Sequence, residues 1–450
     1  MKRVPTFFLS MVLATATLAA CGTPTGTSTT TQNTTAVGAT AAASAATMAP
    51  TSMAATSMTD ATAATSGGSG TTIRVYSSLP RQGQSKSQTD SVVNAIKMRF
   101  AEDKNQVCGG KFTIDYVDLD DATAAKGSWD EAAETGNANK AVSDPAGMVY
   151  IGTFNSGAAK LSIPVLNNAN MVMISPANTY VGLTKPLAAG EPDKYYPNGK
   201  RNYTRVVTND AVQGLADAAW AAKLGVKKVY ILDDQQAYGQ GVAGLFEKNA
   251  KTMGLTVLGH EGIQAKEQNY TSLMTKIKDL GPDMVYFGGI VDNNAGQLLK
   301  DMRAVGMTGD KVKFMGPDGI QTDPFITAAG KDIAEGAYGT VAGLPLSKLG
   351  AKGQAFLKAY KDKFGVEPQT YGPFGYEAAA VTLQALNQVC KADRAAIRDA
   401  VFATKDFDGV LGKWSFDKDG DTTLQTIQGY IVKDGKWEEA NFFNNGQWEK

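Results

Sequence analysis

The feature that most constrains the fold is a regular alternation of short apolar segments with longer amphipathic ones after about residue 72. The spacing of apolar residues predicts strands at 73–77, 112–117, 148–151 and 171–174, and a second series at 203–207, 229–232, 255–258, 284–287 and 312–315. The predicted helices between them are 88–102, 129–142, 155–168, 210–224, 238–253, 270–280 and 296–305. Two such series predict two parallel sheets, each covered by helices on both faces.

The size of this region also favours two lobes. It holds about 380 residues, which is too many for a single hydrophobic core. The final third differs from the rest, with a strand near 337–341, helices at 351–364, 376–389 and 395–403, and a hairpin of 413–416 with 428–432. We therefore predict an α/β protein with two Rossmann-like lobes.

The N-terminus reads as an export signal. Lys2 and Arg3 precede an apolar run from Phe7 to Ala20 that is too short for a comfortable membrane span. The run ends in Leu-Ala-Ala-Cys-Gly, which resembles the bacterial lipobox, so residues 1–20 are a predicted lipoprotein signal peptide and Cys21 its lipidation site. An ordinary signal peptide cleaved nearby and a short membrane anchor remain alternatives.

A segment dominated by Thr, Ala, Ser and Gly follows the predicted lipidated cysteine. From residue 22 to 71 it contains one charged residue, Asp60, and no aromatic residue. Such a composition cannot bury enough apolar surface to offset the entropy of ordering the chain. Residues 21–71 are therefore predicted to form a disordered tether with a reach on the order of 40 Å, and a cell-wall spacer is the alternative.

The composition of the remaining chain excludes several classes of protein. The 44 basic and 44 acidic residues balance, and without Lys2 and Arg3 the count is 42 to 44, a net charge of about −2. No basic stripe indicates a nucleic-acid partner, and no further apolar stretch is long enough to span a membrane. The single histidine, His260, is more typical of a structural or surface residue than of a zinc site or a Ser-His-Asp triad. No G-x-S-x-G motif is present, so we expect no catalysis. We also expect no metal and no cofactor.

In open α/β sheets the ligand site lies at the carboxyl ends of the strands, so two lobes predict a site in the cleft between them. Ser156 follows a predicted strand and starts a helix, where its hydroxyl and free backbone N–H groups can face an anion. Spacing alone leaves open whether Asn155 or Ser156 simply caps the helix.

Six segments, in order, resemble the leucine/isoleucine/valine-binding family of ABC-transporter substrate-binding proteins: Ile151–Ser156, Met173–Thr179, Asp233–Gly239, Tyr286–Gly289, Phe314–Gly319 and Phe416–Gly420. The resemblance covers roughly residues 72–436. It implies the type I periplasmic binding protein fold, with three crossover strands forming a hinge. Lobe 1 would comprise 72–205 and 342–424, and lobe 2 would comprise 206–341 and 425–450.

The resemblance also implies a function. The chain would be a monomeric receptor outside the cytoplasm, held to the membrane by its lipid. It would close its lobes around a small amino-acid-like ligand, branched-chain or similar, and deliver it to ABC permease and ATPase subunits. Three alternatives stay open: a sensor that presents an amide or small carboxylate to a membrane signalling partner, an exported hydrolase, and a structural cell-surface protein.

Individual ligand contacts follow from the same resemblance. Ser156 with Asn155, and Thr179 with the backbone of Ala177 and Asn178, would hold the ligand carboxylate, and that second loop would offer a carbonyl to the ammonium. Asp318 takes the place of an acidic ammonium partner that is usually a longer glutamate in the family. A desolvated ammonium needs such a carboxylate, because burying it unpaired costs several kcal/mol. The alternatives are turn residues in both loops.

Four further positions would complete the site. Tyr238 would cover the ligand on closure, and Phe154 would line the side-chain pocket. Ile290 stands where the family often has an aromatic residue, and Gln84 replaces a family tyrosine. These two departures leave a branched aliphatic ligand less certain than an amino acid of some kind.

The cysteines allow one disulfide. With Cys21 lipidated, Cys108 and Cys390 remain, and each follows a long predicted helix. In the implied fold those helices are neighbours in lobe 1, and exported proteins favour disulfides. We predict a Cys108–Cys390 bridge; two free buried thiols are the alternative.

Overall fold

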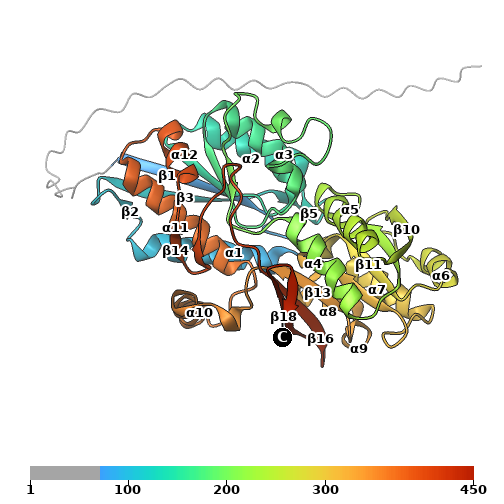
Figure 1. Ribbon diagram of the computed structural model, residues 1–450. Helices are drawn as coiled ribbons and strands as arrows, with labels where there is room; N and C mark the ends of the chain where they lie inside the picture. Colours follow the sequence, from blue (N-terminus) through green and yellow to red (C-terminus); the bar gives the residue numbers. More distant parts are fainter. Residues whose placement is uncertain (1–70, 450) are drawn as a thin grey trace, which may run out of the picture. The chain divides into compact units, whose positions relative to one another are not determined.

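The structure is a computed structural model that describes residues 71–449 (Figure 1). These residues belong to one compact unit that starts at Ser66. The predicted signal peptide, the Cys21 lipidation site and nearly all of the predicted tether lie outside the described residues. Within residues 71–449, no helix is both long enough and apolar enough to cross a bilayer.

The first lobe is built on a six-stranded sheet with the order β2-β3-β1-β6-β7-β8. All neighbouring strands are parallel except the short β2, which runs antiparallel to β3. The strands are β1 (Thr71–Leu79), β2 (Gln106–Val107), β3 (Phe112–Asp120), β6 (Gly147–Gly152), β7 (Val172–Ser175) and β8 (Tyr203–Arg205). The helices are α1 (Lys86–Glu102), α2 (Glu131–Ser143), α3 (Ser156–Asn168), α10 (Ala351–Phe364), α11 (Gly372–Val389) and α12 (Arg394–Phe402).

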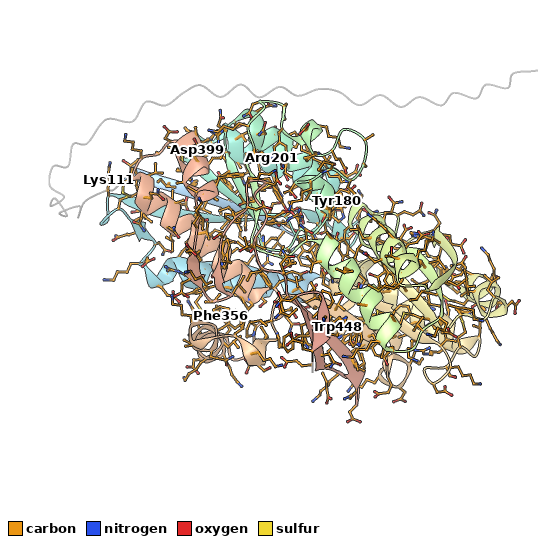
Figure 2. The ribbon with its side chains drawn as sticks, viewed as in Figure 1. Lys111, Tyr180, Arg201, Phe356, Asp399 and Trp448 are labelled. Carbon is orange, nitrogen blue, oxygen red and sulfur yellow. A yellow bond between two sulfur atoms is a disulfide. The ribbon has the colours of Figure 1, made fainter. Side chains whose placement is uncertain are left out.

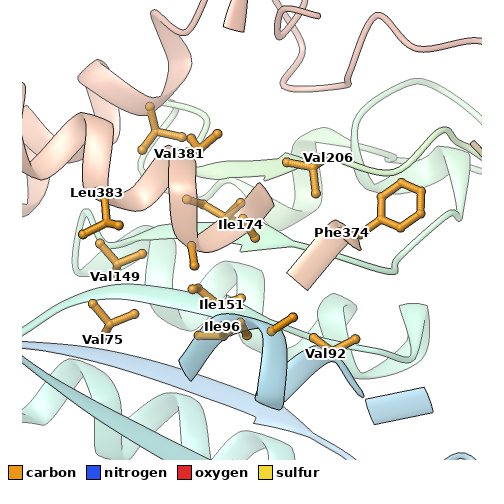
Figure 3. Packing of buried hydrophobic residues seen from close by; sticks show 14 of the residues in the cluster. Val75, Val92, Ile96, Val149, Ile151, Ile174, Val206, Phe374, Val381 and Leu383 are labelled. Carbon is orange, nitrogen blue, oxygen red and sulfur yellow. The ribbon is translucent and has the colours of Figure 1, made fainter. Parts of the chain in front are cut away.

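Helices cover both faces of this sheet because its strands are apolar on both sides. Val149 and Ile151 of β6 face the layer that contains α1 and α11, as Figure 3 shows. Tyr150, between them, faces the layer that contains α2 and α3. Successive side chains of a strand point to opposite faces, so one apolar strand supplies two cores.

The second lobe is built on an eight-stranded sheet with the order β10-β9-β11-β12-β13-β16-β17-β18. Its first five strands are parallel and the last three are antiparallel. The strands are β9 (Lys228–Asp233), β10 (Thr256–Gly262), β11 (Met284–Gly288), β12 (Lys313–Gly316), β13 (Tyr338–Ala342), β16 (Ile427–Lys433), β17 (Lys436–Asn444) and β18 (Gln447–Glu449). The helices are α4 (Asp210–Lys223), α5 (Ala237–Thr252), α6 (Thr271–Asp279), α7 (Ala295–Ala304), α8 (Asp323–Ala329) and α9 (Lys331–Ala334).

The chain passes between the two lobes three times: after β8, after β13 and before β16. Helices α10 to α12 therefore pack on the first lobe although they follow β13 of the second (Figure 1). The predicted α/β architecture with two parallel-stranded lobes is confirmed. The lobe boundaries at 205/206, 341/342 and 424/425 stay predictions.

Short elements complete the chain. Two small sheets pair β4 (Ala122–Thr123) with β5 (Ser128–Trp129) and β14 (Phe407–Gly409) with β15 (Gly412–Trp414). The 3₁₀ turns are η1 (Val181–Leu183), η2 (Asp193–Tyr195), η3 (Val291–Asn293), η4 (Asp318–Ile320) and η5 (Leu346–Lys348).

Two local predictions were wrong. Residues 413–416 do not pair with 428–432, because β15 pairs with β14 and β16 lies between β13 and β17. Trp129 belongs to β5, and the helix starts after Asp130, whose carboxylate accepts the N–H groups of the first turn. Helix α4 begins at Asp210, as predicted, and Asn209 caps it.

The predicted disulfide is present. Cys108 and Cys390 are bonded, with their Cα atoms 5.6 Å apart. The bond ties the turn after β2 to the end of α11, close to Lys111, which donates to the Cys390 carbonyl and is labelled in Figure 2. Two segments separated by 282 residues are thereby fixed on the first lobe.

Candidate functional site

A small cavity lies between the two lobes at the carboxyl ends of their strands. Its volume, including the part open to solvent, is about 290 Å³. The first lobe contributes residues that follow β6 and β7, and the second lobe contributes residues that follow β9, β11 and β12. The lining residues are Phe154, Asn155, Ser156, Ala177, Thr179, Tyr238, Ile290, Asp318, Gly319 and Tyr371.

The cavity brings together most of the residues predicted from the sequence. Phe154, Asn155, Ser156, Ala177, Thr179, Tyr238, Ile290 and Asp318 all line it, although they come from five separate segments. Asn178 and Gln84 do not line it, and Tyr371 lines it without having been predicted. The ligand role of each residue stays a prediction.

The first-lobe wall is suited to an anion. Asn155 occupies the N-cap position of α3, but its side chain makes no capping hydrogen bond, and its buried Oδ1 has no hydrogen-bond partner among residues 71–449. Ser156 is the first helical residue, and its hydroxyl lies 3.3 Å from the backbone nitrogen of Tyr180. No acidic residue occupies the first turn of α3, so the positive end of the helix is not neutralised by its own chain.

Asn178 positions this wall from behind. Its buried amide donates to the carbonyls of Thr153 and Phe154 at 2.9 and 3.0 Å. The Asn178 side chain therefore ties the loop after β7 to the loop after β6, which sets Thr179 beside Ser156. Its own carbonyl accepts from the buried Arg205 at 3.3 Å.

Asp318 provides the acid of the second-lobe wall. It is 5% exposed, and its two oxygens accept from the hydroxyls of Tyr238 at 2.8 Å and Tyr371 at 2.5 Å. Burial raises the pKa of the Asp318 carboxyl, while these hydroxyls oppose the rise by stabilising the charged form. Tyr371 belongs to the first lobe, so the hydrogen bond crosses the cleft.

A second acid, Asp210, lies behind the cavity. Its backbone N–H donates to the Thr179 carbonyl at 2.9 Å. The side chain is fully buried, and neither carboxylate oxygen has a hydrogen-bond partner within the described part of the chain. Burial raises the pKa of Asp210 well above its ordinary value, and the negative charge of Asp318 raises it further. Two buried acids therefore act on the same region of the cleft.

Sequence reasoning missed both Asp210 and Tyr371. An Asp at the start of a helix is typical of a cap, and nothing in its neighbourhood in the sequence distinguishes a buried acid from an exposed one. Tyr371 precedes α11, far along the chain from Asp318, and only the return of the chain to the first lobe brings the two together.

Gln84 is not among the residues that line the cavity. Its backbone nitrogen donates to Asp292 Oδ1 of the second lobe at 2.6 Å. The ligand role expected for Gln84 stays a prediction.

Residues 71–449 contain no group of three or more His, Cys, Asp and Glu side chains that could hold a metal ion. His260 lies between Glu247 and Asp233, with ring-nitrogen distances of 2.7 and 3.1 Å to their carboxylate oxygens. These carboxylates, Asp233 most, raise the pKa of His260.

Two parallel-stranded lobes, three crossings and a small cavity with one wall suited to an anion and a buried acid on the other are the features of a two-lobed solute-binding protein. This is the class of protein to which fold and site together point.

Comparison with known proteins supports the same class. The model of the family described as periplasmic binding protein matches residues 72–436, and the chain belongs to this family. It is 30% identical over 305 residues to the Leu/Ile/Val-binding protein homolog 1 of Brucella abortus. The matched region covers 67% of this chain and 75% of that protein. The family prediction is thereby confirmed, and it implies a location outside the cytoplasm.

Solved structures share the fold. A leucine binding protein LivK from Thermotoga maritima superposes with a TM-score of 0.73 at 23% identity, covering 83% of this chain and 99% of that one. A solute binding protein of R. palustris in complex with 4-hydroxybenzoate superposes with a TM-score of 0.70 at 20% identity, covering 84% and 98%. The fold is therefore common to proteins with chemically different ligands.

Proposed function

We propose that the chain is the lipid-anchored substrate-binding receptor of an ABC importer and binds a small zwitterionic amino acid in the interlobe cavity. The observation that carries the proposal is the pairing, in one cavity, of the uncapped start of α3 with the buried carboxyl of Asp318. A zwitterion needs donors for its carboxylate and an acid for its ammonium, and each wall supplies one of these.

The ligand carboxylate binds at the first-lobe wall. The hydroxyls of Ser156 and Thr179 and the N–H groups at the start of α3 donate to it. The helix end adds favourable electrostatics, because its first N–H groups have no partner within the helix. The Asn178 amide ties the two loops that carry these donors to each other.

The ligand ammonium binds to Asp318, with the charge of Asp210 behind it. Two buried acids without a cation between them disfavour each other, as the raised pKa of Asp210 indicates. A ligand ammonium group relieves this repulsion, whereas a ligand that carries only a carboxylate does not. This charge balance supports an amino acid over a benzoate-like ligand, although both kinds occur among proteins of the same fold.

The ligand side chain packs against the apolar part of the lining. Phe154 and Tyr371 meet edge to face, with ring centroids 5.5 Å apart. Ile290 packs with the ring of Tyr238 in the second lobe. This small aromatic and aliphatic surface supports a branched-chain or similar short side chain, as bound by the Leu/Ile/Val-binding relatives.

The receptor works outside the cytoplasm as a monomer. Lipidation of Cys21 holds it at the membrane, and the 21–71 tether lets the lobes reach the permease. The three crossings form the hinge, and closure around the ligand produces the form that the permease and ATPase subunits accept.

A binding screen on the full chain tests the proposal. Thermal shift and calorimetry compare branched-chain and other small amino acids with hydroxybenzoates, for wild type, Asp318→Asn and the exposed-acid control Asp332→Asn. We expect amino-acid binding that Asp318→Asn weakens by about tenfold or more and Asp332→Asn leaves unchanged. Saturable binding of a hydroxybenzoate without binding of any amino acid would overturn the proposal.

A further inference from the structure

The turn just before helix α1 in the first lobe is hydrogen-bonded to a carboxylate of the second lobe. Ser85 occupies the N-cap position, but its side chain makes no hydrogen bond to the N–H groups of its own helix, and the first turn contains no acidic residue. The carboxylate belongs to Asp292, in η3 after β11. Its Oδ1 accepts from the backbone nitrogens of Gln84 at 2.6 Å and Ser85 at 3.3 Å, and its Oδ2 accepts from the Ser85 hydroxyl.

The backbone around this contact is shaped for a close approach. Gly83 has φ +84°, a conformation that residues with a side chain rarely adopt. A Cβ atom at Gly83 would also lie 2.9 Å from Asp292 Oδ1 and 2.4 Å from the Gly127 carbonyl oxygen. Glycine at this position therefore permits both the turn and the approach of the second lobe.

Asp292 is well placed electrostatically. It is 5% exposed and lies at the positive end of a helix of 17 residues. Burial raises its pKa, while the donors at Ser85 and Gln84, and the charge of Lys266, oppose that rise. The buried carboxylate thus receives these hydrogen bonds from the other lobe.

The contact is separate from the ligand cavity. Neither Gln84, Ser85 nor Asp292 is among the residues that line the cavity. By contrast, the Tyr371–Asp318 hydrogen bond, which also crosses the cleft, is part of the cavity wall.

We propose that Asp292, with Gln84 and Ser85, forms an interlobe latch that stabilises the closed form and slows ligand release without touching the ligand. The inference rests on the hinge closure of the proposed function. When the lobes separate, the turn before α1 loses its hydrogen bonds to Asp292, so the latch shifts the opening equilibrium by the strength of these hydrogen bonds. Its effect is the same for every ligand.

Kinetics on the full chain test the latch, with Asp292→Ala, Asp292→Asn and the exposed second-lobe control Asp332→Ala. We expect the dissociation rate of a bound amino acid to rise about tenfold in Asp292→Ala and less in Asp292→Asn, which keeps one acceptor. The association rate and the ratio of affinities for two amino acids stay unchanged. A dissociation rate equal to that of wild type, or a change that differs between ligands, would overturn the latch.

Hydrogen exchange of the ligand-bound, closed form provides a second readout. The amides of Gln84 and Ser85 donate to Asp292, so in this form both exchange about tenfold faster in Asp292→Ala than in wild type, while the amides of α11 do not change. Equal exchange at these two amides in the closed form would contradict the latch, whichever ligand closes the lobes. Failure of wild type to bind amino acids, together with altered exchange when a hydroxybenzoate is bound, would instead sink the proposed ligand and keep the latch.

Discussion

The hydroxyl of Tyr371 in the first lobe donates to Asp318 Oδ2 in the second lobe at 2.5 Å. This hydrogen bond places a first-lobe donor on the acid that the proposed ligand ammonium needs. It therefore links the closed arrangement of the lobes to the charge state of the site.

Removing the Tyr371 hydroxyl should weaken amino-acid binding, because the hydrogen bond both joins the two lobes and supports the charged form of Asp318. Tyr371→Phe keeps the ring against Phe154 but leaves Asp318 with one tyrosine donor, so we expect amino-acid affinity to fall roughly tenfold. Calorimetry measures the change. Tyr376→Phe is the matched control, because the Tyr376 hydroxyl bonds to the surface residue Glu102, away from the cavity. Equal losses in the two variants would refute a specific role for Tyr371.

Replacing Asp210 should raise the stability of the protein and weaken amino-acid binding. Asp210→Asn replaces a buried ionisable carboxyl, whose oxygens lack partners within residues 71–449, by a neutral amide, so the free energy of unfolding should rise by about 1–3 kcal/mol, measured by urea unfolding at pH 7. Amino-acid affinity should fall at least about tenfold, because the ammonium loses an acid behind it.

Asp217 on the same helix provides the comparison. Its carboxylate accepts from Tyr286 and Thr340, each at 2.7 Å, so Asp217→Asn should lower the free energy of unfolding instead. A stabilised Asp217→Asn, or an Asp210→Asn variant that binds as wild type does, would count against the assignment.

His260 should make stability depend on pH in a defined direction. Asp233 and Glu247 raise its pKa above the ordinary value of 6.5 in the folded protein. Its stabilising contribution is therefore complete below the unfolded pKa and is lost as pH rises through the folded pKa.

Two measurements check this behaviour of the histidine. The difference in unfolding free energy between wild type and His260→Gln should shrink as pH rises from about 5.5 to 8.5. Because the chain has one histidine, its NMR signal reports the folded pKa without ambiguity. A folded pKa at or below that of the unfolded chain would contradict the ion-paired geometry.

The disulfide should stabilise the first lobe without affecting binding. The double variant Cys108→Ser, Cys390→Ser releases a loop of 282 residues, and we expect the free energy of unfolding to fall by about 2–5 kcal/mol. Amino-acid affinity should stay within about twofold of wild type, since neither cysteine lines the cavity. A large loss of affinity in protein that remains folded would show a coupling that the structure does not explain.

Much of the fold could be predicted because its signals are local. Strands such as 148–151 and helices such as 155–168 follow from apolar spacing, and parallel sheets bring the ends of successive strands together. For that reason the strand pattern and the family resemblance together predict Ser156, Thr179 and Asp318 around one cavity.

The remaining features depend on contacts between distant segments. Which strand pairs with β16 is decided by the sheet edge that β13 offers, so the predicted hairpin had no local signal against it. Asp210 looks like an exposed cap until its helix packs against α5 and the second sheet. Tyr371 and Asp292 reach their partners only when the two lobes meet, and no spacing along the chain encodes that contact.

Calorimetry with three matched compounds tests the central claim most directly: leucine, 4-methylpentanoic acid, which lacks its ammonium, and 3-methylbutylamine, which lacks its carboxylate. If the cavity holds a carboxylate at Ser156 and an ammonium at Asp318, leucine binds, and each truncated compound binds at least about a hundredfold more weakly. Binding of 4-methylpentanoic acid as tight as that of leucine would contradict the account.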